Sequence, residues 1–216
     1  MSTDFMQDGT KKPRRTPGRP RSFSEAEVLE RVRRVFLEKG FSAASVDDLA
    51  KAAGLNRPSL YAAFGNKEQL YLAVIARHGT QSVAGIDQIM AGEGSIEQRL
   101  TKLYRTAISL YTAPPRPQGC MIIGTASVEA PTHPDIAKAA AAFIAGNEKA
   151  LERAFANAVE AGELSPEPSP VARARLGGAI FDTLAVRARI GTSIDDLRAF
   201  ASSAVPLICA SPAQPT

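Results

Sequence analysis

The sequence contains no tryptophan, and only two of its 216 residues are cysteine. Cys120 and Cys209 are too few for a disulfide framework, and they form no CxxC pair of the kind that holds zinc. We therefore expect neither a metal nor a cofactor. Aromatic residues make up 6% of the chain, and no long stretch alternates Val or Ile with polar residues as a half-buried strand does. Alanine is abundant instead, and the sequence predicts an all-α fold of about nine helices.

Long hydrophobic runs are also missing. No apolar stretch approaches the roughly 18 to 20 residues that span a bilayer, and the polar, basic N-terminus lacks the apolar core of a secretory signal. We expect a cytoplasmic protein without a membrane partner. Catalytic motifs are missing too, since the chain has no HExxH, P-loop or GxSxG sequence and no ExxH pairs for a di-iron site. A helical enzyme is thus the weaker interpretation, and we expect a protein that is not an enzyme.

Positive charge is concentrated in one part of the chain. The formal net charge is +4, and residues 1–80 contain 14 Lys and Arg against 9 Asp and Glu, whereas residues 81–216 contain 12 against 13. Six basic residues and no acid lie between Lys11 and Arg21, and three prolines keep this segment extended. We expect residues 1–22 to form a basic, disordered arm. Its charge indicates a polyanionic partner, although a merely solvated tail stays open.

Capping residues and apolar periodicity predict the helices that follow. Ser24 and Glu27 match a capping box at the start of the first helix, and Gly40 matches the residue that ends it. Asn66 and Ser95 match the N-caps of two later helices. Apart from two short helices described next, we expect helices over about 25–39, 67–90, 96–112, 120–130, 134–161, 171–190 and 194–209.

Two short helices between residues 46 and 65 form the most informative pattern. Ser45 caps the first helix, Gly54 supplies the positive φ of the turn after it, and Asn56 caps the second. Four apolar residues give the pair a buried seam, namely Leu49, Ala53, Leu55 and Leu60. Two short helices joined by a tight turn are typical of DNA-binding helix-turn-helix units, although an ordinary helical hairpin has the same outline.

The residues in and around this unit closely resemble the TetR family of bacterial repressors. The resemblance lies in the stretch from Phe41 to Gly54, followed by Ser59-Leu60-Tyr61, Phe64 and Lys67-Glu68. It covers roughly residues 23–72, and beyond them it is architectural only. It implies a homodimer in which residues 23–66 form a DNA-binding head and residues 67–210 form a helical body for ligand binding and dimerisation.

The resemblance also implies which residues contact DNA. Ser45 would contact a phosphate from the start of its helix, and Tyr61 and Lys67 would hold further phosphates. Arg57 and Ser59 would face the major groove. This agrees with general chemistry, because hydroxyls and helix N-termini position the DNA backbone, while Arg reads guanine through two parallel hydrogen bonds.

The basic arm contains a second DNA-binding pattern. Its segment Pro17-Gly18-Arg19-Pro20-Arg21 resembles the core of an AT-hook, an extended peptide that lays Arg side chains into a narrow minor groove. The match is partial, because no Arg precedes Gly18. We hypothesise that Arg19 and Arg21 enter the minor groove beside the operator, and purely electrostatic attachment remains the alternative.

The last two predicted helices are the candidates for dimerisation. Each has an apolar stripe, and Gly177 and Gly178 would allow a close helix crossing. Antiparallel pairs from two chains would form a four-helix bundle. The alternative is that these stripes face the chain's own core. The expected interface residues are Leu176, Ile180, Leu184, Leu197, Phe200 and Ala204.

A cavity for a small-molecule effector is implied by the resemblance, and the sequence identifies neither that effector nor the operator. Helical pockets are mostly apolar, so the candidate lining residues are Leu103, Tyr104, Tyr111, Cys120, Met121, Phe143 and Phe181. Cys120 is a separate candidate for a reactive thiol, because it lies at the predicted start of a helix, where the dipole lowers a thiol pKa. A buried, inert Cys120 is the alternative.

These observations together predict a transcriptional repressor that binds a palindromic operator as a homodimer and is released by a small molecule. Two other functions stay open. One is a repressor that senses oxidants or electrophiles through Cys120. The other is an architectural DNA-binding protein without a sensor, which a body of well over 100 residues disfavours.

Overall fold

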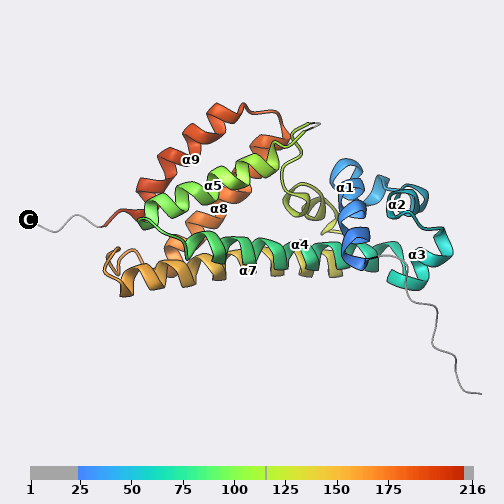
Figure 1. Cartoon of the computed structure of the whole chain (residues 1–216), viewed down its shortest axis with the longest axis horizontal. Helices are drawn as coiled ribbons and strands as arrows, with labels where there is room; N and C mark the ends of the chain where they lie inside the picture. The colour runs from blue at the N-terminus through green and yellow to red at the C-terminus, as the bar shows by residue number, and fades with distance from the viewer. Residues whose placement is uncertain (1–23, 115, 212–216) are drawn as a thin grey trace, which may run out of the picture.

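The computed structural model describes residues 24–114 and 116–211, and over these ranges the chain is all-α, with nine α-helices, one π-helical turn and no strand (Figure 1). The predicted fold class is therefore confirmed. The elements are α1 (Glu25–Ala43), α2 (Val46–Ala53), α3 (Arg57–Phe64), α4 (Lys67–Met90), α5 (Ile96–Tyr111), η1 (Ile122–Ala126), α6 (Ser127–Glu129), α7 (Pro134–Glu160), α8 (Pro170–Arg189) and α9 (Ile194–Cys209).

Local capping explains where most helices begin. The side chains of Ser45, Asn66 and Ser95 each accept a hydrogen bond from the backbone N–H three residues on, and the side chain of that residue accepts one from the backbone N–H of the cap, which completes a capping box. The capping box predicted for Ser24 is wrong, because Ser24 occupies the N-cap of α1 but forms no side-chain cap hydrogen bond. Helix α1 begins at Glu25 all the same, since its apolar face packs into the core.

The first helix does not stop where the sequence suggests. Gly40 has the non-helical angles φ 78° and ψ 176°, yet a last helical turn continues to Ala43. The resulting kink turns Phe41 back onto the helix, and its ring lies 6.3 Å from that of Phe36. The kink therefore closes the aromatic core beneath the first three helices.

Two long helices, α4 and α7, lie side by side and carry the remaining elements (Figure 1). The head, α1 to α3, gathers at one end of α4, while α5, α8 and α9 pack together at the other end. The apolar core of the head does not end at residue 66. It continues through Tyr71 and Val74 of α4 into Ile122 of η1 and Ile136 of α7, so head and body share one buried cluster.

The segment around Gly119 packs tightly against α8. Gly119 has φ +66°, and a Cβ atom added there would lie 2.3 Å from the carbonyl oxygen of Ala185. Arg189 of the same helix donates from Nη1 to the carbonyl oxygen of Gln118 at 3.1 Å. Gly119 is thus required both by its left-handed backbone and by the close approach of α8.

Replacing Gly119 with Ala should destabilise the protein more than the same change at Gly162. Both glycines have positive φ, but a Cβ at Gly162 would meet nothing within 4 Å, so this control carries only the backbone cost of roughly 1–2 kcal/mol. Overpacking against Ala185 should add about 1–3 kcal/mol for Gly119→Ala. Urea unfolding of both variants measures the difference, and equal losses would show that the segment moves away from α8 at little cost.

Candidate nucleic-acid interface and ligand cavity

The outward face of α3 is formed by its first and second turns. Arg57 and Tyr61 are exposed one turn apart, and Tyr61 retains 43% of its accessible surface. Leu60 points the other way and is buried against Leu49 of α2 in the head core. Ser59 is half-buried, and its backbone N–H donates to the capping Asn56 side chain. The helix is therefore anchored by one side and presents Arg57 and Tyr61 on the other.

Arg57 is held in place by an acidic residue of α2. Its Nε and Nη2 atoms donate to the two carboxylate oxygens of Asp47, in a bidentate ion pair on the surface. The hydrogen bond from Arg57 lowers the pKa of Asp47, and the same bond raises the pKa of Arg57. Asp47 thus fixes the guanidinium at the edge of α3 through two of its five N–H groups, and the other three remain available to another acceptor.

The hydroxyl of Ser45 is engaged in the cap of α2. It accepts from the backbone N–H of Asp48 and donates to the carboxylate of Asp48 at 2.7 Å. Lys39 forms an ion pair with the same carboxylate at 2.8 Å, and the bonds from Lys39 and Ser45 lower the pKa of Asp48 to about 2. Ser45 is exposed, so it remains accessible at the N-terminus of α2.

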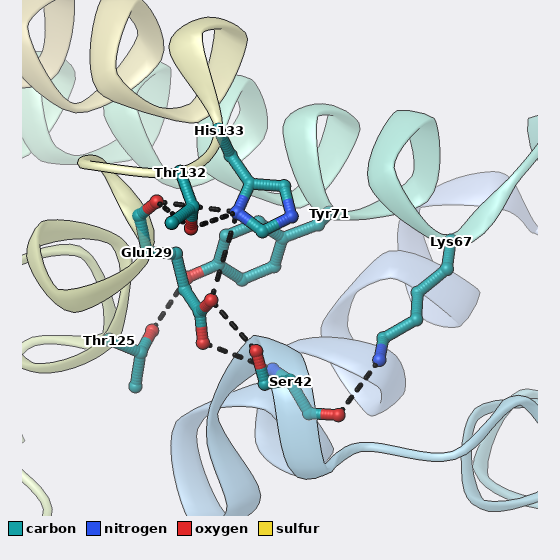
Figure 2. A network of polar contacts seen from close by, with 7 residues as sticks. All are labelled: Ser42, Lys67, Tyr71, Thr125, Glu129, Thr132 and His133. Atoms are coloured by element: carbon teal, nitrogen blue, oxygen red, sulfur yellow. Dashed lines mark hydrogen bonds and ion pairs between the residues drawn. The ribbon is translucent and has the colours of Figure 1, made fainter.

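Lys67 faces the head rather than open solvent. Its Nζ atom donates to the carbonyl oxygen of Ser42 at 3.2 Å (Figure 2). It also lies 4.7 Å from the centroid of the Phe41 ring. Burial lowers the pKa of Lys67. The contacts of Lys67 with Ser42 and Phe41 join the first turn of α4 to the end of α1. The family resemblance did not indicate them. Arg19 and Arg21, the predicted minor-groove residues, lie outside the described residues.

A carboxylate of the body holds the same loop of the head. Glu129 of α6 accepts hydrogen bonds from the backbone N–H of Ser42 at 3.1 Å and from its hydroxyl at 2.8 Å. Figure 2 shows these bonds together with His133, whose Nδ1 lies 3.8 Å from the Glu129 carboxylate and whose ring packs against Phe41. We call Ser42, Lys67, Glu129 and His133 the junction, because they connect α1 of the head to α4, α6 and α7.

A cavity of about 670 Å³ lies between α1 of the head and helices α4, α5, α7 and α8 of the body. Six of the seven predicted residues line it: Leu103, Tyr111, Cys120, Met121, Phe143 and Phe181. Tyr104 does not, because its ring is fully buried against Phe181 and its hydroxyl donates to the carbonyl oxygen of Gly177 at 3.1 Å. The volume is within the range of roughly 300–1,000 Å³ that is common for small-molecule sites.

Cys120 and His78 face each other in the cavity wall. The Sγ atom of Cys120 lies 3.8 Å from Nε2 of His78, and the His78 ring stacks on Phe143. Burial lowers the pKa of His78 to about 4, so the ring is neutral at pH 7. Burial also raises the pKa of Cys120, which opposes the thiolate expected at a helix start. The prediction of a low thiol pKa at Cys120 is therefore wrong.

Sequence reasoning missed one wall of the cavity. It is formed by α1, which contributes Glu30, Arg33 and Leu37, and Asn147 of α7 lines the opposite side. The sequence placed α1 in the DNA-binding head alone, and the i, i+3, i+7 spacing of these residues was the available indication that they share a helix face. The cavity is therefore bounded by the head as well as by the body.

The predicted dimer residues separate into two groups. Leu184 and Leu197 are fully buried and Ala204 nearly so, all in the core of their own chain, so they are not available to a partner, and this part of the prediction is wrong. The reason is that α8 has apolar residues on two faces, and the sequence does not tell them apart. Leu176 is 47% exposed, and Ile180 and Phe200 are partly exposed.

Comparison with known families agrees with this geometry. Residues 28–74 match the model "Bacterial regulatory proteins, tetR family", and residues 97–203 match "Tetracyclin repressor-like, C-terminal domain". The chain belongs to the TetR family of transcriptional regulators, which bind DNA through a helix-turn-helix. It is thus a member of a family of regulators rather than of enzymes.

Relatives and solved structures match over most of the chain. The HTH-type transcriptional repressor ComR of Escherichia coli (strain K12) is 28% identical over 201 residues, which cover 93% of this chain and 96% of ComR. The transcriptional regulator AcuR of Cereibacter sphaeroides is 30% identical and covers 92% of each chain. A cysteine mutant of the regulator CifR, solved with double-strand operator DNA, superposes with a TM-score of 0.78 at 25% identity over 87% of this chain and 98% of CifR.

Within residues 24–114 and 116–211, no helix has the length and apolar character needed to cross a membrane.

Proposed function

We propose that this protein is a transcriptional repressor that binds a palindromic operator as a homodimer and leaves it when a small molecule occupies the cavity. The observation that carries the proposal is the face of α3, where Arg57 and Tyr61 are exposed on a helix whose other side is anchored by Leu60. A recognition helix needs this arrangement, because its outer residues must reach base edges while its inner residues fix its position.

Arg57 is the residue best placed to read a base. It lies in the first turn of α3. In helix-turn-helix proteins, the N-terminal residues of the recognition helix contact the base edges in the major groove. The ion pair with Asp47 restrains the guanidinium at the start of α3, and the planar guanidinium keeps further N–H donors free for a guanine. Tyr61, one turn later, and Ser45, at the start of α2, are suited to the flanking phosphates.

Replacing Arg57 with Ala should weaken binding to the operator, obtained by selection from random DNA, by about 5- to 150-fold, which corresponds to the 1–3 kcal/mol of one bidentate contact. Binding to unrelated DNA should change much less. Arg153→Ala is the matched control, because Arg153 is an exposed arginine paired with Asp87 on the body and the net charge changes equally. Equal losses on operator and unrelated DNA would assign Arg57 to phosphate binding.

Dimerisation is expected on the outer face of α8 and α9. Leu176 and Ile180 lie one turn apart on α8, and Phe200 of α9 is partly exposed, with the Arg187 guanidinium 4.5 Å from its ring. Leu207 adds a side chain that is 71% exposed. Exposed apolar residues on two helices that pack together favour burial against a second copy.

The double variant Leu176→Glu, Ile180→Glu should sediment as a single 22.9 kDa chain at concentrations where the parent is a dimer. A two-fold symmetric interface contains each substitution twice. Dimerisation would therefore bury unpaired carboxylates from both chains, which is energetically unfavourable. Val128→Glu is the control, because Val128 is 72% exposed on α6, away from this face. A dimeric double variant would move the interface to another surface.

One short segment connects a wall of the cavity to Ser42 of the DNA-binding head. Cys120 and Met121 line the cavity at the start of this segment, and Glu129 at its end binds Ser42. Helix α1 forms the opposite wall. A ligand that displaces either wall therefore changes the position of the head, and the spacing of the two heads on DNA changes with it.

Replacing Glu129 with Ala should loosen the head and weaken operator binding in the absence of effector. If the junction contributes about 1 kcal/mol to the free energy of operator binding, the affinity for the operator falls about fivefold. Combining it with Ser42→Ala should give less than the sum of the two single effects, because both changes remove the hydrogen bond from the Ser42 hydroxyl to Glu129. Glu160→Ala, an exposed change at the far end of α7, is the control. Additive effects in this double-mutant cycle would exclude the junction as a coupling element.

A further inference from the structure

Tyr111 presents an unpaired hydroxyl group to the cavity. Its side chain lines the cavity and is half-buried, and its hydroxyl forms no hydrogen bond with any residue that the structure describes. The side-chain atoms that have neither a partner nor accessible surface belong to Arg77, Arg99 and Asn147, and the Tyr111 hydroxyl is not among them. This hydroxyl therefore retains accessible surface, and a ligand in the cavity can reach it.

The position of Tyr111 is fixed by its ring and by its backbone. It is the last residue of α5, and its ring packs against both apolar clusters of the described chain. Its carbonyl oxygen accepts from the backbone N–H groups of Gln118, at 2.9 Å, and Gly119, at 3.1 Å. Both of these residues also line the cavity. The hydroxyl is thus held by a helix end and by the segment that folds back onto it.

The Tyr111 hydroxyl is a hydrogen-bond donor at pH 7. Burial raises the pKa of Tyr111 well above its ordinary value, and nearby Cys120 and Asp182 raise it further, so the phenol keeps its proton. A phenol hydroxyl donates readily to an oxygen acceptor. Within a largely apolar cavity, a ligand oxygen that accepts this bond would satisfy a donor that no described side chain satisfies.

The groups around this hydroxyl favour a carbonyl oxygen as the acceptor. Asp182 does not line the cavity, but it is close enough to raise the pKa of Tyr111. A carbonyl oxygen adds no negative charge near Asp182, and it carries no proton that would need an acceptor of its own. Leu103, Phe143 and Phe181 line the same cavity and suit an apolar body.

The charged lining residues all lie on α1. They are Glu30, Arg33, Arg34 and Glu38, and with Arg116, which pairs with Glu38, they comprise three guanidiniums and two carboxylates. The side chains of Arg34 and Glu38 are 75% and 57% exposed, so much of this charge lies in contact with solvent. Uncharged probes therefore isolate the contribution of Tyr111.

We propose that the effector is a largely apolar carbonyl compound, a ketone or an ester, whose oxygen accepts a hydrogen bond from Tyr111. This inference rests on the proposed function of the cavity as an effector site. It assigns the polar contact to the end of α5 and the apolar body to the walls that contain Leu103, Phe143 and Phe181.

Three isomeric ketones and the hydrocarbon that they share test the proposal. Butyrophenone, benzyl ethyl ketone and benzylacetone place a carbonyl at successive positions of the same side chain on a phenyl ring, and butylbenzene has a methylene group at each position. Apparent Kd values come from the rise in Tm of the full chain as each probe is titrated. At least one ketone should bind roughly 2- to 12-fold more tightly than butylbenzene, the range of one hydrogen bond. If no ketone binds more tightly than butylbenzene, or if no probe shifts Tm, the proposal is overturned.

Replacing Tyr111 with Phe should abolish the preference for that ketone, because the ring remains and only the hydroxyl is removed. No hydrogen bond within the described residues is lost, so the variant should fold. Tyr104→Phe is the matched control on the same helix, because the Tyr104 hydroxyl donates to the carbonyl oxygen of Gly177 outside the cavity, and it should keep the preference. A preference that persists in Tyr111→Phe contradicts the assignment.

Operator binding in the presence of the preferred ketone separates this contact from the proposed function. Release of the operator by the ketone, lost in Tyr111→Phe, supports both conclusions. A ketone that binds through Tyr111 and leaves operator affinity unchanged would support the contact and contradict the role of the cavity as an effector site.

Discussion

The buried contact between Tyr71 and the two phenylalanines of α1 is the constraint on which the arrangement of head and body depends. The Tyr71 ring lies 4.7 Å from that of Phe36 and 5.1 Å from that of Phe41, and its hydroxyl lies 2.6 Å from Oγ1 of Thr125. One side chain of α4 therefore contacts α1 by its faces and η1 by its hydroxyl. Because this cluster is closely packed, the head cannot rotate freely, and any change in its position must be shared by α4 and η1.

Local interactions are the part of the fold that the sequence predicts well. Helices α4 and α9 begin and end at the predicted residues, since Asn66 and Ser193 cap them and the apolar periodicity continues between the ends. The helix-turn-helix is equally local, because Ser45, Gly54 and Asn56 fix two short helices within a dozen residues. Ser24 is the exception, where matching residue types at the right spacing did not form the bond.

Contacts between distant residues are the part that the sequence does not reveal. Ser42 and Glu129 are separated by 87 positions, and no periodicity connects them. The same holds for the cavity wall on α1, because Glu30 and Arg33 have the spacing of an ordinary surface ion pair. Burial is a property of the whole fold as well, which is why Cys120 has a raised pKa where its place at a helix start suggested the opposite, and why Leu184 and Leu197 face their own chain.

Helix α1 belongs to the head and also lines the cavity. This affects how such a protein can be recombined with its relatives. A chimera joined at residue 66 would exchange the helix-turn-helix, but it would also import a foreign Glu30, Arg33 and Leu37 into the wall of the cavity. A graft that keeps ligand selectivity must leave the cavity-facing side of α1 unchanged and exchange only the surface of α2 and α3. In this protein, the residues that line the cavity therefore come from both sides of residue 66.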